Sequence, residues 1–176
     1  SAIIIEDKVG LKKNSLFKNQ KGVNQDSIED FSKKISTAKQ SCISENFLII
    51  ARIESFILGK NLKDALARAE AYSKAGADAI LIHSKEKSPK QIFEFAKKFS
   101  KSPNYKPMVC VPSTYSNTHE NELIKKGFKI VIYANHMMRS CYPAMVNTAK
   151  KILGAKKSSV IEKKISSAKE MIELIK

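Results

Sequence analysis

Short apolar runs alternate with amphipathic segments along the chain. Five runs are rich in β-branched or other apolar residues and cover residues 2–5, 47–52, 79–83, 108–112 and 130–134. Such runs are typical of strands that are buried on both faces of a parallel sheet. Each run precedes a segment with apolar residues at helical spacing, so the pattern predicts repeated βα units in one α/β architecture.

Capping residues mark the ends of several amphipathic segments. Asp26, with Glu29 three residues later, predicts the start of a helix over residues 27–39. Asn61 and Gly76 predict the start and the stop of the second helix. The other predicted helices are one with Ser88 as N-cap and Pro89 as its first residue, and three over residues 120–126, 136–153 and 158–175.

The composition indicates an ordinary water-soluble domain, with 43% hydrophobic and 28% charged residues. No apolar run approaches the roughly 18 residues that a membrane-spanning helix requires, and the first residues are too few for a signal-peptide core. We therefore expect a cytoplasmic protein without a membrane partner. Cys42, Cys110 and Cys141 are too widely spaced for a disulfide framework or a zinc site, so we expect reduced, mostly buried thiols.

The net charge of +15 raises the possibility of a nucleic-acid partner. However, arginine, the usual base-reading residue, occurs only at positions 52, 68 and 139, and the lysines are scattered without interleaved aromatic residues. This pattern favours solvated helix faces and no nucleic-acid partner. A basic field also suits a small anionic substrate.

Charged and polar side chains stand at the ends of the predicted strands. Glu6 follows the first strand, Arg52 ends the second and His83 ends the third. Catalytic groups occupy these positions in parallel α/β barrels, so all three are candidate site residues. The alternatives are a solvated pair of Glu6 with Asp7 or a salt bridge to Lys8, and a hydrogen-bonded core histidine at position 83.

Arg52 ends an otherwise buried strand, where an unpaired guanidinium would be costly. It therefore needs an anion, and the candidates are Glu54, Glu6 and the phosphoryl group of a substrate. The planar fork of arginine matches both carboxylate and phosphate. The alternative is a purely structural pair of Arg52 with Glu54.

A long segment separates Asp7 from the predicted cap at Asp26. Its length of about 20 residues exceeds that of an ordinary βα loop and is typical of a lid. Lys12 and Asn14 lie in this segment. A lid that brings an ammonium and an amide over a phosphoryl group would exclude water, which would otherwise convert transfer into hydrolysis. The alternative is a basic surface loop without a function.

Five βα units are too few to close an eight-stranded barrel, which normally takes about 250 residues. The chain also begins inside a predicted strand. We therefore expect residues 1–176 to be the C-terminal portion of a single barrel domain in a longer protein, and to be inactive alone.

Five motifs occur in order along the chain at or near the ends of the predicted strands: IEDK at 5–8, ARIESF at 51–56, GADAILIHSK at 76–85, VPSTY at 111–115 and ANH at 134–136. Together they resemble the phosphoenolpyruvate mutases of the isocitrate lyase superfamily. The resemblance runs through essentially the whole chain. It implies a TIM-type (β/α)8 barrel and a Mg²⁺-dependent isomerase that converts phosphoenolpyruvate to phosphonopyruvate, the entry to phosphonate biosynthesis.

The resemblance also implies roles for single residues. Glu6 matches an acidic residue that holds Mg²⁺ largely through water, whereas the family's metal-binding aspartates have no counterpart in this chain. Arg52 and His83 would stabilise the anionic substrate, and Asn14 would clamp the phosphoryl group together with Lys12. Asn135 is also expected to bind the substrate. The alternative is that Asn135 caps the following helix. A homo-oligomer is expected, because the family packs C-terminal helices between subunits, and residues 145–153 and 161–175 carry apolar stripes.

Departures from related families separate the possible activities. Isocitrate and methylisocitrate lyases carry a cysteine in the loop, where this chain reads Lys12-Lys13-Asn14-Ser15, so a carbon–carbon lyase is disfavoured. Phosphonopyruvate hydrolases typically carry threonine at the position of Asn14, which favours the mutase. Val9-Gly10-Leu11 stands where mutases commonly have an aromatic residue and a proline. Phosphonopyruvate hydrolase, and a noncatalytic barrel relic or interaction subunit, remain the alternatives.

Overall fold

The computed structural model describes residues 1–10, 13–17 and 19–175. They form two compact units that meet in sequence between Tyr133 and Ala134. The first unit contains the sheets, and the second contains helices only. Within the described ranges, no helix combines the length and the apolar character needed to cross a membrane.

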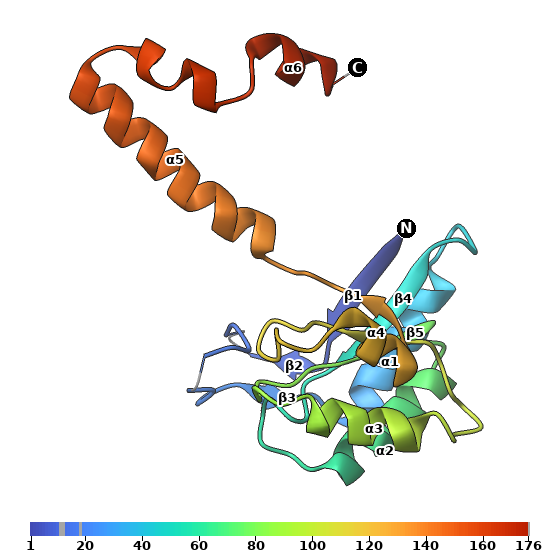
Figure 1. Ribbon diagram of the computed structural model, residues 1–176. Coiled ribbons are helices and arrows are strands. Elements are labelled where there is room, and N and C mark those ends of the chain that lie inside the picture. Colours follow the sequence, from blue (N-terminus) through green and yellow to red (C-terminus); the bar gives the residue numbers. More distant parts are fainter. Residues whose placement is uncertain (11–12, 18, 176) are drawn as a thin grey trace. The chain divides into compact units, whose positions relative to one another are not determined.

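The first unit is built on a five-stranded parallel sheet (Figure 1). Its strands are β1 (Ala2–Glu6), β4 (Leu48–Ile53), β5 (Ala79–Ile82), β6 (Met108–Cys110) and β7 (Phe128–Val131). Their order in the sheet follows their order in the chain. This sequential order is typical of a barrel wall. In a doubly wound sheet, the order of the strands would reverse part-way across the sheet. All five predicted strands are confirmed.

One predicted strand is displaced along the chain. β7 begins at Phe128, two residues before the predicted start at residue 130. The fully buried Phe128 pairs in register with Met108, so burial and pairing determine the strand's start rather than the β-branched run alone.

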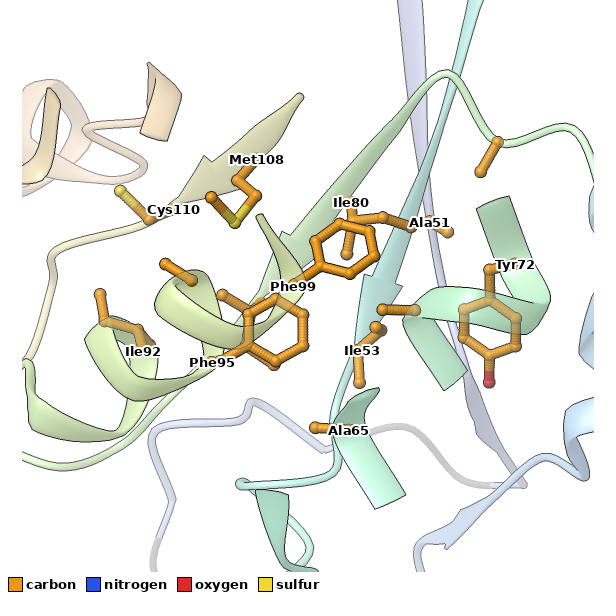
Figure 2. Packing of buried hydrophobic residues seen from close by; sticks show 14 of the residues in the cluster. Ala51, Ile53, Ala65, Tyr72, Ile80, Ile92, Phe95, Phe99, Met108 and Cys110 are labelled. Carbon is orange, nitrogen blue, oxygen red and sulfur yellow. The ribbon is translucent and has the colours of Figure 1, made fainter. Parts of the chain in front are cut away.

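Four helices cover one face of this sheet: α1 (Ile28–Gln40), α2 (Leu62–Lys74), α3 (Lys90–Phe99) and α4 (Glu120–Lys125). The main core lies between helices and strands, and Figure 2 shows Tyr72, Phe95 and Phe99 packed beside Ile53 and Ile80. Successive strand residues point to opposite faces. The other face therefore carries a second, smaller cluster without any helix residue: Ile50, Ala79, Leu81, Val109 and Val111.

The helix starts confirm one predicted cap and correct two. Asn61 caps α2 as predicted, since its side chain accepts a hydrogen bond from the Asp64 amide. Asp26 does not cap α1, because Ser27 takes that place and Asp26 is instead paired with Lys34. Similarly, Ser88 does not cap α3, which follows Pro89 without a side-chain cap.

The turn after α2 also agrees with its prediction. Gly76 has φ of 105°, a left-handed conformation that residues with a side chain rarely adopt. The glycine therefore ends α2 and leads the chain directly into β5.

The segment between Asp7 and Asp26 is not a featureless loop. Its ends form a short antiparallel pair, β2 (Lys8–Val9) with β3 (Asn24–Gln25). Lys8 pairs with Gln25 and Val9 pairs with Asn24. The base of the predicted lid is therefore fixed by backbone pairing immediately after β1.

The second unit contains α5 (His136–Ala155), the 3₁₀ turns η1 (Ser158–Val160) and η2 (Glu162–Lys164), and α6 (Ala168–Glu173). The predicted continuous helix over residues 158–175 is wrong. Ile165 is extended, and Ser167 forms a capping box with Glu170 that starts a separate helix. Apolar spacing alone missed this break, because the capping signal lies inside the periodic pattern.

The three cysteines are free thiols with different exposure. Cys110 is buried, Cys42 is partly buried and Cys141 is exposed. No disulfide joins these three cysteines, and their reduced state stays a prediction. The prediction of mostly buried thiols is correct for Cys110 only.

Candidate active site

Neighbouring strands bring Glu6, Arg52 and His83 to one edge of the sheet. Glu6 pairs in register with Arg52, and Arg52 pairs with Leu81, two residues before His83. Arg52 and His83 each follow, by two residues, a buried side chain of the smaller cluster, namely Ile50 and Leu81. Because side chains alternate along a strand, Arg52 and His83 point to the face opposite the helices. Both residues stand at the C-terminal ends of their strands.

The Arg52 guanidinium is held on two of its three nitrogens. Nε donates to Oε1 of Glu54 at 2.7 Å, and Nη2 lies 2.9 Å from both Oγ of Ser15 and Nδ1 of His83. Oε2 of Glu6 lies 3.7 Å from Nε. The predicted pairing with Glu54 is confirmed, and Glu6 also lies nearby as expected.

The remaining nitrogen of Arg52 distinguishes a purely structural pair from a binding group. Arginine has five N–H donors, and two of them are on Nη1. Among the described residues, no side chain or carbonyl accepts a hydrogen bond from Nη1. The Arg52 side chain is 24% exposed, so it is only partly enclosed by the protein.

Glu54 lies at the centre of the cluster and is fully buried. Oε1 lies 2.7 Å from Arg52 and 3.2 Å from His83, and Oε2 lies 2.5 Å from Ser15 and 3.2 Å from Lys8. Burial alone would raise its pKa. The hydrogen bond with His83, the Arg52 charge and the Ser15 hydroxyl outweigh burial and hold the pKa of Glu54 far below its ordinary value. Glu54 is therefore held as a carboxylate at neutral pH and fixes its neighbours.

The His83 ring has two partners at one nitrogen. Nδ1 lies 2.9 Å from Nη2 of Arg52 and 3.2 Å from Oε1 of Glu54. A guanidinium can only donate, so the contact with Arg52 requires a lone pair on Nδ1 and places the proton of the neutral ring on Nε2. A proton on Nδ1 would be donated to Glu54 instead. The tautomer of His83 therefore decides whether Nδ1 accepts from Arg52 or donates to Glu54.

Ser15 connects the loop to the strand ends. It is buried, donates to Glu54 at 2.5 Å, and accepts from Lys8 and Arg52 at 2.9 Å each. The sequence placed Ser15 in the loop motif that begins at Lys12, where residues are positioned for chemistry, but it gave Ser15 no specific role and did not indicate that Lys8 is buried. The signal for Ser15 was its place beside Asn14 in the loop motif, but nothing local marked Lys8 as buried.

The other predicted site residues are not joined to this cluster by described contacts. Asn14 is exposed, and its Oδ1 accepts a hydrogen bond from the Leu16 amide at 2.9 Å. Lys12 lies outside the described residues. Asn135 belongs to the second unit, where it precedes α5. The roles of all three stay predictions.

Asp7 is fully buried behind the site, so the alternative of a solvated pair of Glu6 with Asp7 is wrong at this position. Oδ1 accepts from the Glu54 backbone amide at 2.9 Å. Oδ2 accepts from Gln25 and Tyr72 at 2.8 Å each and from Arg68 at 3.3 Å. Burial raises the pKa of Asp7 although these donors oppose the shift. Asp7 therefore holds the backbone that carries Glu54.

The described residues do not complete a magnesium site. They contain no group of three His, Cys, Asp or Glu side chains that could hold a metal. Glu6 offers one carboxylate at the sheet edge, whereas Mg²⁺ requires six oxygen ligands, several of them commonly water. Glu6 therefore stays a predicted ligand that needs partners beyond the described residues.

Accessible space adjoins this edge of the sheet. A hollow of about 420 Å³ lies along β1 and is lined by Ile3, Ile4, Ile5, Glu6 and Arg52. It lies along the edge strand β1 and combines an apolar wall with one carboxylate and one guanidinium.

The family model described as Phosphoenolpyruvate phosphomutase matches residues 1–153. The Phosphoenolpyruvate phosphomutase of Tetrahymena pyriformis is 38% identical over 174 residues. The Phosphonopyruvate hydrolase of Variovorax sp. (strain Pal2) is also 38% identical, over 179 residues. These alignments cover 99% of this chain but 57% and 59% of the two relatives. The chain thus spans somewhat more than half the length of these relatives.

Solved structures agree with these alignments. The crystal structure of phosphoenolpyruvate phosphomutase from Streptomyces platensis subsp. rosaceus has a TM-score of 0.89 at 38% identity and covers 98% of this chain and 58% of that one. Phosphonopyruvate hydrolase in complex with oxalate and Mg²⁺ has a TM-score of 0.84 at 34% identity, with the same two coverages. The predicted fold is confirmed, since the sheet is part of a TIM-type (β/α)8 barrel. The chain belongs to the phosphoenolpyruvate phosphomutase family.

Proposed function

We propose that this chain is part of an isomerase that interconverts phosphoenolpyruvate and phosphonopyruvate. The proposal rests on the family and on one observation, the edge of Arg52 that the protein leaves without a described acceptor. Arg52 is fixed through Nε and Nη2, and the residue lines the hollow along β1. A held guanidinium with two remaining donors suits the carboxylate or phosphoryl group of such a substrate.

The reaction requires transfer within one bound molecule. The bond between the enol oxygen and phosphorus breaks, a bond between C3 and phosphorus forms, and the enol oxygen becomes a ketone. No proton is gained or lost in this exchange. Arg52 contributes by orienting the anion and by stabilising its charge, because Glu54 and His83 prevent the guanidinium from turning away.

Water must be excluded during this transfer, because attack by water would give pyruvate and inorganic phosphate. The loop that contains Asn14 is the candidate barrier. The turn at Asn14 uses its side-chain carbonyl oxygen, and the amide nitrogen takes no part in that turn. Asn14, with Lys12, is thus proposed to clamp the phosphoryl group, and Asn135 is proposed to help bind the substrate.

We infer that the activity depends on Mg²⁺, with Glu6 as one ligand and the other oxygens from elsewhere in the complete protein. One relative supports this inference, since phosphonopyruvate hydrolase has been crystallised with oxalate and Mg²⁺. Removal of Mg²⁺ with a chelator should abolish turnover, and its addition should restore it. Turnover that persists after chelation would contradict the inference.

Residues 1–176 are proposed to be the C-terminal portion of one barrel domain. The chain spans only 57% to 59% of its two relatives, and the outer strand β1 leaves Ile3 and Ile4 45% and 41% exposed. A homo-oligomer is also proposed, because α5 exposes Met137 and Met145 to 75% and 60%. Light scattering on the complete protein tests this second point, and a monomer at working concentration would contradict it.

Phosphonopyruvate hydrolase is the second candidate, since one such enzyme is as similar to the chain as the mutase of Tetrahymena is. The complete protein should be incubated with phosphonopyruvate and Mg²⁺ and followed by phosphorus NMR. Formation of phosphoenolpyruvate supports the mutase, and formation of inorganic phosphate with pyruvate supports the hydrolase. If neither forms in the presence of Mg²⁺, the proposed enzyme activity is wrong and a noncatalytic role is favoured.

A further inference from the structure

A buried lysine lies between the loop and the candidate site. Lys8 is the first residue of β2, and its side chain is only 1% exposed. Its Nζ donates to the Lys13 carbonyl at 2.8 Å and to Oγ of Ser15 at 2.9 Å, and it lies 3.2 Å from Oε2 of Glu54. An ammonium has three N–H donors, so these three oxygens account for all of them.

Lys8 differs from Arg52 because all of the donors on its ammonium have partners. Arg52 retains two donors on Nη1, whereas Lys8 would have to break a contact before it could bind a substrate. A buried ammonium without partners is costly, so all three contacts favour a fixed position. Lys8 is therefore placed to hold other groups rather than to bind an anion itself.

The three acceptors come from two parts of the chain. Lys13 and Ser15 belong to the loop, whereas Glu54 follows β4. The backbone of Lys8 is itself fixed by pairing with Gln25 of β3 (Figure 1). Lys8 thus links a rigid base, the loop and the carboxylate that holds Arg52.

The rest of the described loop is attached mainly to itself. Asn14 accepts hydrogen bonds from Leu16, Phe17 and Gln20, which all lie within six residues of it. Leu16 and Phe17 are 40% and 63% exposed. The described polar contacts from this part of the loop to the strand ends pass through Lys8 and Ser15.

We propose that Lys8 is a positioning residue that fastens the loop at residues 13–15 beside Arg52. It acts through the Lys13 carbonyl, Ser15 and Glu54. Its consequence for catalysis rests on the proposed function, since a fastened loop would keep water from the phosphoryl group. The competing explanation is that Lys8 only balances the charge of Glu54 in the core.

Proteolysis of the complete protein tests the fastening independently of activity. Chymotrypsin should cleave after the exposed Phe17 about tenfold faster in Lys8→Met than in the parent, because the loop opens more often. Lys33→Met is the matched control, since Lys33 is an exposed lysine on α1. It should be cleaved at the parent rate. Unchanged cleavage in Lys8→Met would overturn the proposal, as would acceleration only in parallel with global unfolding.

A measurement on the parent covers the case in which Lys8→Met does not fold. Acetic anhydride should acetylate Lys8 at least about tenfold more slowly than Lys33, because the Lys8 ammonium is buried and fully bonded. Cleavage after Phe17 should raise the reactivity of Lys8 towards that of Lys33, because loop and lysine hold each other. If the cleaved protein remains folded and Lys8 stays protected, Lys8 is held by the core without the intact loop and the proposal is wrong.

Kinetics connect the fastening to the proposed reaction. In Lys8→Met the ratio of phosphate to phosphoenolpyruvate formed should rise and KM should increase, while Lys33→Met should match the parent. If the parent itself is inactive, the proposed function fails, but the proteolysis result still decides the role of Lys8. Faster cleavage with an unchanged product ratio and unchanged KM would overturn the link between fastening and water exclusion.

Discussion

Glu6 and Asp7 are adjacent carboxylates in the sequence but occupy opposite sides of the sheet. The Glu6 side chain is 19% exposed, adjoins the hollow and lies 3.7 Å from Nε of Arg52. Asp7 is completely buried on the helix side and accepts hydrogen bonds from Glu54, Gln25, Tyr72 and Arg68. A one-residue step along a strand reverses the side-chain direction, so one carboxylate borders the site and its neighbour supports the site from behind.

The contrast between Glu6 and Asp7 suggests a criterion: a supporting group has its hydrogen-bonding capacity filled by the protein, whereas a binding group retains some of it. Asp7 accepts four hydrogen bonds or ionic contacts from the protein, and Glu54 accepts three in addition to its contact with His83. Arg52 keeps one edge without a described acceptor. Substitution of a fully bonded group should therefore chiefly lower stability, whereas substitution of Arg52 should chiefly lower activity.

The largest effect is expected for Asp7→Asn in the complete protein. The new amide nitrogen would face donors from Gln25, Tyr72 and Arg68, and Arg68 would retain only Asp64 as a charged partner. The free energy of unfolding should fall by about 3 to 5 kcal/mol, as for a broken buried ion pair. Chemical denaturation measures this change.

Tyr72→Phe is the milder companion, because it removes one donor to Asp7 and adds no repulsion. Its expected cost is about 1 to 2 kcal/mol. If Asp7→Asn were as stable as the parent and yet inactive, Asp7 would belong to the reacting groups and the contrast with Glu6 would fail.

Arg52→Ala should cost about 2 to 4 kcal/mol of transition-state stabilisation, which is roughly a 30- to 900-fold loss of kcat/KM. The reason is the loss of a preorganised cationic donor. Stability should fall less than in Asp7→Asn. Steady-state kinetics with phosphonopyruvate provide the measurement.

Arg52→Lys is the matched variant for this test. It retains the charge but not the planar fork, so it should recover only part of the activity. Full activity in Arg52→Ala would show that this edge of the sheet does not bind the substrate.

Glu54→Gln tests the supporting carboxylate through pH. The folded-state pKa of Glu54 lies below its ordinary value of 4.5, so its ionic contacts stabilise the folded protein above about pH 4.5 and are lost as the pH falls through the folded-state pKa. The parent should be more stable than the variant by on the order of 2 kcal/mol at neutral pH. The gap should narrow steadily below pH 4.5.

Denaturation curves from neutral to acidic pH follow this difference. The exposed Glu45 supplies the control, and Glu45→Gln should track the parent. A constant gap between the parent and Glu54→Gln across the acid range would mean that Glu54 is not held as a carboxylate.

The smallest effect is expected for Asn14→Thr, which tests transfer against hydrolysis. Threonine has a shorter reach and a single donor, so mutase activity should fall by about three- to tenfold while phosphate release rises. Both products should be measured in the same reaction by phosphorus NMR.

Asn19→Thr is the control that separates the proposed catalytic role of the Asn14 side chain from its role in the loop turn. The Asn19 Oδ1 accepts from the backbone amide two residues later at 2.9 Å, as Asn14 does. Equal effects in the two variants would assign the loss to the turn. Parent activity without new phosphate in Asn14→Thr would remove the main reason to favour the mutase.

The sequence by itself determined the elements whose signals are local. Apolar runs located five parallel strands, and Asn61 and Gly76 bounded α2, because capping and left-handed turns depend on single side chains. The pairing of Arg52 with Glu54 was also predictable. A spacing of two residues at a strand end leaves both side chains on one face.

The tertiary structure alone decided which polar groups are buried and with whom they bond. Tyr72 and Asp7 are 65 residues apart, and Ser15 and Glu54 are 39 apart, so no local period joins them. Lys8 reads as an ordinary solvated lysine until β2, the loop and β4 enclose it. Periodicity records which face a residue takes, but burial and hydrogen bonding depend on the elements that packing brings to that face.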